Sequence, residues 1–254
     1  WSPSEKAETQ MAHFAATIIA NYGFDWKNDY HKLWQWSVDK PEDFWSALWE
    51  WHGIIGDKGT RMIENPGKMP GTKFFPDATL NYAENMLSFD DRLRDIPALI
   101  AHGEDGRRTV LSRADLRDKV LRLAGWMRAR GVIKGDRVAG YVPNSEIALI
   151  AMLASASLGA IFSSCSPDFG ITGVTDRFGQ IEPKILISIN GYHYNGKIID
   201  KREVVAQLVD ALPSIEAVLI DFYLDDYRDI SMIRAASVFA DALTHAPLDS
   251  FVRV

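Results

Sequence analysis

The sequence predicts an α/β protein in which a helical, tryptophan-rich N-terminal region precedes a three-layer α/β/α region with a mainly parallel sheet. Residues 1–88 contain seven of the eight tryptophans but few segments that read as strands. From about residue 96 onward, short apolar runs alternate with helical patterns. This alternation is typical of a parallel sheet that helices cover on both faces.

Short aromatic helices are expected in the N-terminal region. Ser2–Glu5 reads as a capping box with proline in the first turn. Apolar residues then follow helical spacing from Met11 to Tyr22, and Gly23 ends the pattern. A second aromatic helix is expected to begin at Pro41.

The aromatic side chains of this region allow two interpretations. They form either a cap laid over another domain or the core of the region itself, and the sequence leaves both open. Residues 56–72 read as a turn-rich connector.

Strands and helices are expected to alternate along the rest of the chain. Ser112 with Asp115 opens a long helix ended by Gly131. The apolar run 147–162 is short for a membrane span and reads as a buried helix that continues into a buried strand. The other expected elements are a hairpin (98–102 and 108–112), strands at 137–142, 184–190 and 217–221, and helices near 171–180 and 201–211.

Composition excludes several classes of protein. The net charge is −6 with both signs interspersed, so neither nucleic acid nor an acidic membrane is an expected partner. One cysteine, Cys165, cannot form an internal disulfide or a cysteine-based zinc site, and it is expected to be a small buried side chain. Without a signal-peptide pattern in the first residues, the expected location is cytoplasmic.

Three segments follow the expected C-terminal ends of strands: 141–146, 162–170 and 191–197. Because the C-terminal ends of parallel strands meet at one edge of a sheet, these segments are candidates for a shared ligand crevice. The alternative is that their Gly, Pro, Ser and Asp residues are ordinary turn residues.

The last segment, GYHYNGK, has the glycine and lysine spacing of a phosphate-binding loop. Ile198 stands where such a loop needs a hydroxyl, and Tyr192–Tyr194 are too bulky to let the backbone wrap a triphosphate. Lys197 therefore either neutralises a single phosphate as a point charge or is a solvated surface lysine.

No catalytic residue and no metal ligand is assigned. The HExxH and G-x-S-x-G patterns are absent, and the six histidines are scattered without metal-ligand spacing. Ser145, Ser163 and Ser164 have no base evident in the sequence.

Several segments in order resemble the adenylate-forming acyl-CoA synthetases. They are WSPSEKAETQMAHF, FFPDATLNYAENML, the run from Gly131 to Gly170, DRFGQIEPKILI and YHYNGK. The resemblance spans the chain, from an acetyl-CoA-synthetase-like cap (residues 1–88) into the first α/β subdomain of the large domain (residues 89–254). SPDFG together with YNGK favours the acetoacetate branch over the acetate branch.

The resemblance implies a ligase that uses ATP, Mg²⁺ and CoA to convert acetoacetate into a thioester through an acyl-adenylate. The family's phosphate loop and C-terminal domain are expected beyond Val254, so the chain is expected to be an N-terminal portion that is inactive alone. Its expected partners are these small molecules and the rest of its own polypeptide. A ligase for acetate, propionate or butyrate and a non-catalytic binding module are the alternatives.

The resemblance also implies part of a CoA site. In the related acetyl-CoA synthetases, the nucleotide end of CoA lies near a loop that corresponds to Phe162, Ser163 and Ser164. Its phosphate meets basic residues on a loop that corresponds to Tyr194, Asn195, Gly196 and Lys197. Lys197 keeps a basic group, whereas Tyr194 replaces one.

Overall fold

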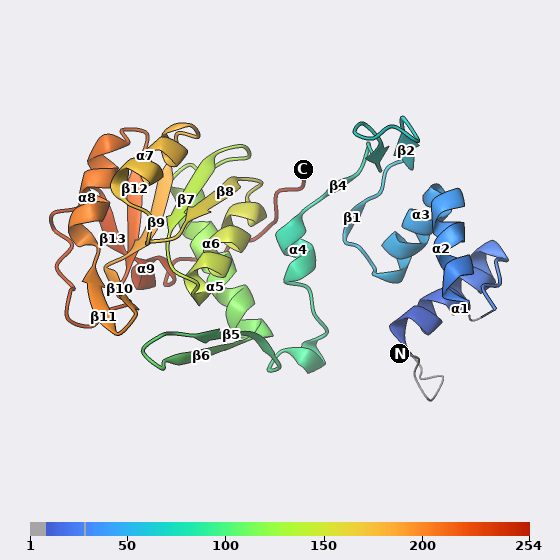
Figure 1. Cartoon of the computed structure of the whole chain (residues 1–254), viewed down its shortest axis with the longest axis horizontal. Coiled ribbons are helices and arrows are strands. Elements are labelled where there is room, and N and C mark those ends of the chain that lie inside the picture. The colour runs from blue at the N-terminus through green and yellow to red at the C-terminus, as the bar shows by residue number, and fades with distance from the viewer. Residues whose placement is uncertain (1–8, 28) are drawn as a thin grey trace. The chain divides into compact units, whose positions relative to one another are not determined.

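The computed structural model describes residues 9–27 and 29–254. Packing divides the chain into two compact units, one ending at Leu80 and the other beginning at Asn81. Figure 1 shows the course of the chain.

The described part of the first unit contains three helices: α1 (Gln10–Tyr22), α2 (Tyr30–Asp39) and α3 (Pro41–Trp51). The Thr9 hydroxyl accepts a hydrogen bond from the Ala12 N–H and caps the start of α1. Gly23 ends α1 in the left-handed conformation (φ 65°). The helices expected up to Gly23 and from Pro41 are therefore confirmed.

The capping box expected at Ser2–Glu5 lies outside the described residues. Helix α2 is missing from the sequence prediction, although Asp29 caps it by accepting from the His31 N–H (3.0 Å) and Leu33 and Trp36 face inward. The mean apolar character of this helix is low, so its helical periodicity was not evident from the sequence.

The aromatic side chains build a core within the first unit. Trp36 stacks on Phe24 with ring centroids 5.4 Å apart, and Phe14 meets Phe44 edge to face at 6.1 Å. The interpretation in which these residues form the region's own core is thus confirmed for this cluster, although Trp34 remains 51% exposed.

The expected connector, residues 56–72, contains two short strands, and each pairs with a short strand that follows it. β1 (Gly56–Asp57) pairs with β4 (Thr79–Leu80), and β2 (Ile63–Glu64) pairs with β3 (Lys73–Phe74), both antiparallel. Two-residue strands are too short to produce an alternating pattern in the sequence.

The second unit contains a five-stranded, fully parallel sheet with the order β13-β12-β9-β7-β8. In chain order this is 5-4-3-1-2, so the direction of winding reverses between β7 and β9. The strands are β7 (Arg137–Tyr141), β8 (Ile161–Cys165), β9 (Ile185–Ile189), β12 (Ala217–Asp221) and β13 (Ala236–Val238).

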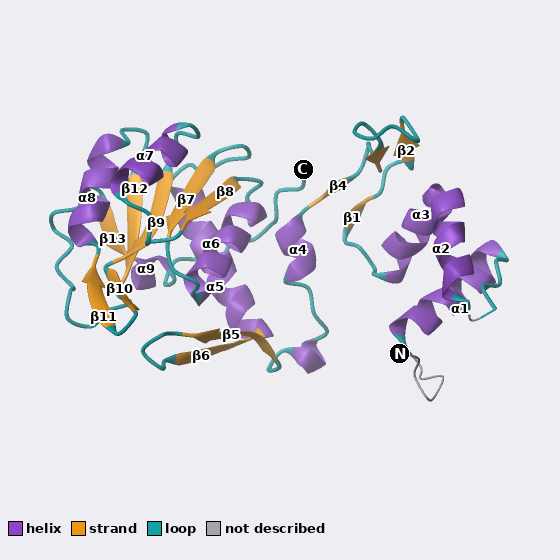
Figure 2. Cartoon of the chain, viewed as in Figure 1, coloured by secondary structure: helices purple, strands orange, loops and turns teal. Residues whose placement is uncertain are grey.

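Helices cover both faces of this sheet, as Figure 2 shows. Along β9, the side chains of residues 185, 187 and 189 join one apolar core and Leu186 joins the other. The first core contains side chains of α5 (Arg113–Ala129), α6 (Glu146–Ser157) and α9 (Phe239–Ala242), and the second contains side chains of α7 (Ile171–Gly179) and α8 (Arg202–Ala211). The predicted three-layer α/β/α architecture is confirmed.

A hairpin and two short helices precede the sheet. β5 (Pro97–His102) and β6 (Arg108–Ser112) pair antiparallel, as expected. The predicted start of α5 at Ser112 is confirmed, and Ser112 and Asp115 exchange both hydrogen bonds of a capping box. Short helices α4 (Tyr82–Met86) and η1 (Asp91–Leu93) lie between Asn81 and the hairpin.

Three sequence expectations are corrected. β8 is not a buried strand but an edge strand, with Ile161 55% exposed, because only β7 pairs with it. The segment 191–197 is not an open loop: β10 (Gly191–Tyr194) and β11 (Lys197–Asp200) form a separate two-stranded hairpin. Strand β13 and helix α9 are missing from the prediction.

Candidate functional site

A crevice opens at the C-terminal edge of the sheet, beside the point where the winding reverses. Open parallel sheets bind ligands at this position because the loops that leave the two central strands there diverge to opposite faces. The cavity has a volume of about 450 Å³. It is lined by His102, Gly103, Glu104, Val142, Pro143, Asn144, Ala148, Ser164, Cys165, Ser166, Pro167, Asp168, Tyr192, His193, Tyr194 and Tyr223.

All three segments singled out in the sequence contribute to this one cavity. Residues 142–144 follow β7, residues 164–168 include the end of β8, and residues 192–194 belong to β10. The structure thus brings the three segments together, as the shared-crevice interpretation expects.

Two of the seven expected site residues line the cavity, and the other five do not. Ser164 and Tyr194 line the cavity, whereas Phe162, Ser163, Asn195, Gly196 and Lys197 do not. The Phe162 ring packs over the backbone of Gly140 and belongs to the apolar core. Lys197 is exposed on β11 opposite Tyr194, and among the described residues its ammonium makes no hydrogen bond or ion pair.

One wall of the cavity is fixed by Asp168. Its carboxylate accepts hydrogen bonds from the Tyr192 hydroxyl (2.6 Å) and the Ser166 hydroxyl (2.8 Å). These two bonds, that of Tyr192 first, lower the pKa of Asp168 below its ordinary value. Asp168 therefore presents an ionised acceptor to the cavity.

Behind this wall lies Lys201, which is only 9% exposed. Its Nζ donates to the hydroxyl oxygen of Tyr141 (3.1 Å), and that hydroxyl donates to the carbonyls of Pro167 (3.0 Å) and Phe169 (2.7 Å). Burial raises the pKa of Tyr141 to about 12 and lowers that of Lys201. This network holds the turn that carries Asp168.

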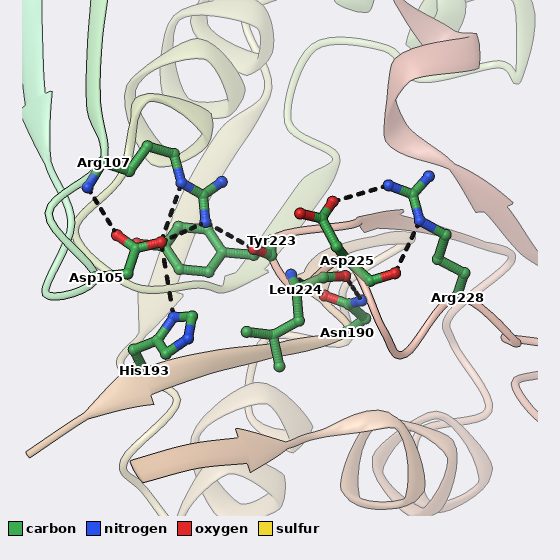
Figure 3. A network of polar contacts seen from close by, with 8 residues as sticks. All are labelled: Asp105, Arg107, Asn190, His193, Tyr223, Leu224, Asp225 and Arg228. Atoms are coloured by element: carbon green, nitrogen blue, oxygen red, sulfur yellow. Dashed lines mark hydrogen bonds and ion pairs between the residues drawn. The ribbon is translucent and has the colours of Figure 1, made fainter. Parts of the chain in front are cut away.

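The opposite wall comes from the turn between β5 and β6. Glu104 Oε2 accepts a hydrogen bond from the Asn195 N–H (2.8 Å), and Asp105 Oδ2 lies 3.7 Å from His193 Nδ1. Figure 3 shows the second contact together with Arg107 and Tyr223. Residues of this turn are missing from the sequence-based site, because nothing in a hairpin turn indicates a contact 91 residues further along the chain.

The chemical character of the lining is acidic and aromatic. It contains the carboxylates of Glu104 and Asp168 and the rings of Tyr192, Tyr194 and Tyr223, but no lysine or arginine. Such a cavity suits a planar group that offers hydrogen-bond donors, and it disfavours a phosphate.

Neither a metal site nor a membrane span is found in the described parts of the chain. Across residues 9–27 and 29–254, no three His, Cys, Asp or Glu side chains are grouped so that they could hold a metal ion. Within the same residues, no helix combines the length and apolar character that crossing a bilayer requires. Cys165 is buried, as expected.

Comparison with known proteins assigns the family. The family model described as AMP-binding enzyme matches residues 89–245. The chain belongs to the AMP-binding enzyme family. A second model, described as acetyl-coenzyme A synthetase N-terminus, matches residues 30–86.

Curated members of the family are similar over most of this chain. An acetoacetyl-CoA synthetase from Macaca fascicularis is 40% identical over 245 residues, which cover 95% of this chain and 36% of the relative. One from Rhizobium meliloti (strain 1021) is 41% identical over 214 residues, covering 84% and 32%. This family member thus spans about a third of the length of the curated relatives it matches.

A solved structure agrees with the fold. Acetoacetyl-CoA synthetase from Streptomyces lividans superposes with a TM-score of 0.90 at 35% identity, covering 100% of this chain and 39% of that one. The sequence-based resemblance to acyl-CoA synthetases is thereby confirmed.

Proposed function

We propose that the chain is the N-terminal portion of an ATP-dependent, AMP-forming ligase that converts acetoacetate into acetoacetyl-CoA. The observation that carries this proposal is the similarity of the chain to acetoacetyl-CoA synthetases. Those of Danio rerio, Macaca fascicularis and Rhizobium meliloti are 38–41% identical to it. Because the chain spans about a third of these relatives, the rest of the polypeptide is its first partner, and the chain alone is inactive. Residues 1–88 are assigned to the cap region and residues 89–254 to the first α/β subdomain.

The reaction has two steps. The acetoacetate carboxylate attacks the α-phosphorus of ATP, which forms the acyl-adenylate and releases pyrophosphate; Mg²⁺ neutralises phosphate charge in this step. The CoA thiol then loses its proton and attacks the acyl carbon, and AMP leaves. No residue of this chain is assigned to the transferred groups or to Mg²⁺.

The chain contributes part of the CoA site, at Phe162, Ser163, Ser164, Tyr194, Asn195, Gly196 and Lys197. The charge distribution supports this assignment. Because no lysine or arginine is among the described residues that line the cavity, the adenine ring is assigned to its interior, against Tyr194 and Asp168, while the phosphate stays outside. Lys197 lies on the hairpin that forms one wall, and within residues 9–27 and 29–254 its ammonium has no hydrogen-bond or ion-pair partner, so it is a cation available to that phosphate.

Another short acid is the competing substrate. A malonamoyl-CoA synthetase from Penicillium aethiopicum is 38% identical over 225 residues, so similarity in this portion does not by itself select the acyl group. Acetate, propionate and butyrate are alternatives for the same reason. A non-catalytic binding module is disfavoured by the family match over residues 89–245. The cytoplasm is the proposed location.

Replacing Lys197 in the full-length protein tests the CoA assignment. Lys197→Glu should raise KM for CoA about tenfold or more, because a lost charge-assisted phosphate contact costs roughly 1.5–3 kcal/mol. Adenylate formation, followed by acetoacetate-dependent pyrophosphate exchange, should be unchanged. Lys134→Glu, an exposed lysine in the turn before β7, is the matched control. Wild-type CoA kinetics in Lys197→Glu would refute the assignment.

A further inference from the structure

The hairpin that carries Lys197 is not part of the main sheet. Among the described residues, β10 and β11 pair with each other and with no further strand, and a two-stranded hairpin alone is marginally stable in water. Its Asn195-Gly196 turn has positive φ at both residues (48° and 72°), which fixes the reversal but not the position of the turn over the crevice. The position must therefore come from contacts with other segments.

Two hydrogen bonds attach the hairpin to other segments, and the Tyr192 and Ile199 side chains pack with an apolar core of the second unit. Near its base, the Tyr192 hydroxyl donates to Asp168. At the turn, the Asn195 N–H donates to Glu104 (2.8 Å). Between these two hydrogen bonds, His193 Nδ1 lies 3.7 Å from Asp105 Oδ2, which is too far for a hydrogen bond. The hydrogen bond at the tip of the hairpin thus comes from Glu104, an acidic residue of the β5–β6 turn.

That acidic turn is itself held firmly. The Arg107 guanidinium donates to Asp105 (3.0 Å) and to the Tyr223 carbonyl (2.7 Å), and it lies 4.2 Å from the centre of the Tyr223 ring, as Figure 3 shows. The β5–β6 turn is therefore a fixed support to which the tip of the hairpin is attached.

We propose that Glu104 is a positioning residue for CoA. By accepting the Asn195 N–H, it fixes the turn two residues before Lys197 and so places the lysine ammonium for the CoA phosphate. This inference rests on the proposed function. Glu104 acts through its acceptor oxygen rather than its charge, since a negative charge beside the hairpin tip opposes an approaching phosphate.

Two variants separate the acceptor from the charge. Glu104→Gln keeps an oxygen that can accept the Asn195 N–H, and KM for CoA should stay within about twofold of wild type. Glu104→Ala removes the acceptor, and KM for CoA should rise about fivefold, the effect of one lost hydrogen bond. In both variants, pyrophosphate exchange should match the wild type.

Dephospho-CoA, which lacks the 3′-phosphate, separates positioning of Lys197 from general loosening of the crevice. With this substrate, Glu104→Ala should change KM by less than about twofold, because the Lys197 contact is already missing. Equal increases for both substrates would show a merely structural role, and equal effects of the Gln and Ala variants would show a role of charge. Either result, or wild-type kinetics in Glu104→Ala, overturns the inference.

Lys197→Glu in the same assays distinguishes failure of the CoA assignment from failure of the positioning role of Glu104. If Lys197→Glu shows wild-type CoA kinetics, the proposed CoA assignment fails and the role of Glu104 fails with it. If Lys197→Glu raises KM while Glu104→Ala does not, only the positioning role is wrong. Should Glu104→Ala fail to fold, as judged by pyrophosphate exchange, Glu104→Asp provides the same comparison, because it withdraws the carboxylate by one methylene.

Discussion

The Tyr192 hydroxyl lies 2.6 Å from the Asp168 carboxylate and joins strand β10 to the turn that follows β8. Both residues line the crevice at the C-terminal edge of the sheet. This hydrogen bond connects two of the three segments that converge there, so it determines the shape of the cavity and the charge of its wall.

Removing this hydroxyl should change the titration of Asp168. In Tyr192→Phe, the pKa of Asp168 should rise toward its ordinary value, because the hydrogen bond from Tyr192 is the main cause that lowers it. An NMR titration of the Asp168 carboxyl carbon measures this. Tyr194→Phe, on the same hairpin, is the control and should leave the titration as in the wild type. The same Asp168 pKa in Tyr192→Phe and wild type would contradict this account of the wall.

Replacement of two helical glycines by alanine should change the stability of the protein in opposite directions. A β-carbon at Gly125, in α5, would overlap the carbonyl oxygen of Ala246, whereas at Gly173, in α7, the nearest heavy atom is 3.9 Å away. Gly173→Ala should stabilise the protein by about 0.5–1 kcal/mol, because alanine favours the helix. Gly125→Ala should destabilise it by about 1–3 kcal/mol through overpacking. Urea unfolding measures the stability of both variants. A Gly125→Ala protein more stable than wild type would show that the Ala246 carbonyl oxygen does not lie close to Gly125.

Asp221 should make stability depend on pH in the acidic range. Burial, reinforced by Glu146, raises its pKa from 3.8 to about 6. Between these values the folded protein holds a proton that the unfolded chain has lost, so the contribution of Asp221 to stability falls as pH rises through about 6. We therefore compare the free energy of unfolding of Asp221→Asn with that of wild type at two pH values. The difference should be about 1–3 kcal/mol more favourable to Asp221→Asn at neutral pH than near pH 4.

Urea unfolding of both proteins across this range checks the sign. A difference between Asp221→Asn and wild type that stays constant with pH would mean that Asp221 titrates normally in the folded protein.

Local signals in the sequence predicted most of the second unit. Ser112 with Asp115 located the start of α5, and continuous apolar runs located β7, β9 and β12. These signals work because each depends on neighbours within a few residues. Helix α2 was missed because its mean apolar character is low, and β13 because it has only three residues.

The candidate site was predictable only in part. Parallel strands must place their C-terminal loops at one edge, so the convergence of three segments followed from the fold class. The Asn195-Gly196 dipeptide was a usable signal for the hairpin, since both residues readily adopt positive φ. The contribution of Glu104 was not predictable, because its partner Asn195 lies 91 residues away and no short-range pattern records that contact.

Hydrogen–deuterium exchange of the full-length protein, with and without CoA, tests most directly whether the crevice receives CoA. We expect CoA to slow amide exchange in residues 163–168 and 192–197, the segments that converge on the cavity and carry Lys197. The turn before β7, which contains Lys134, should exchange at the same rate in both samples. Binding of CoA that leaves both crevice segments unprotected would contradict the account.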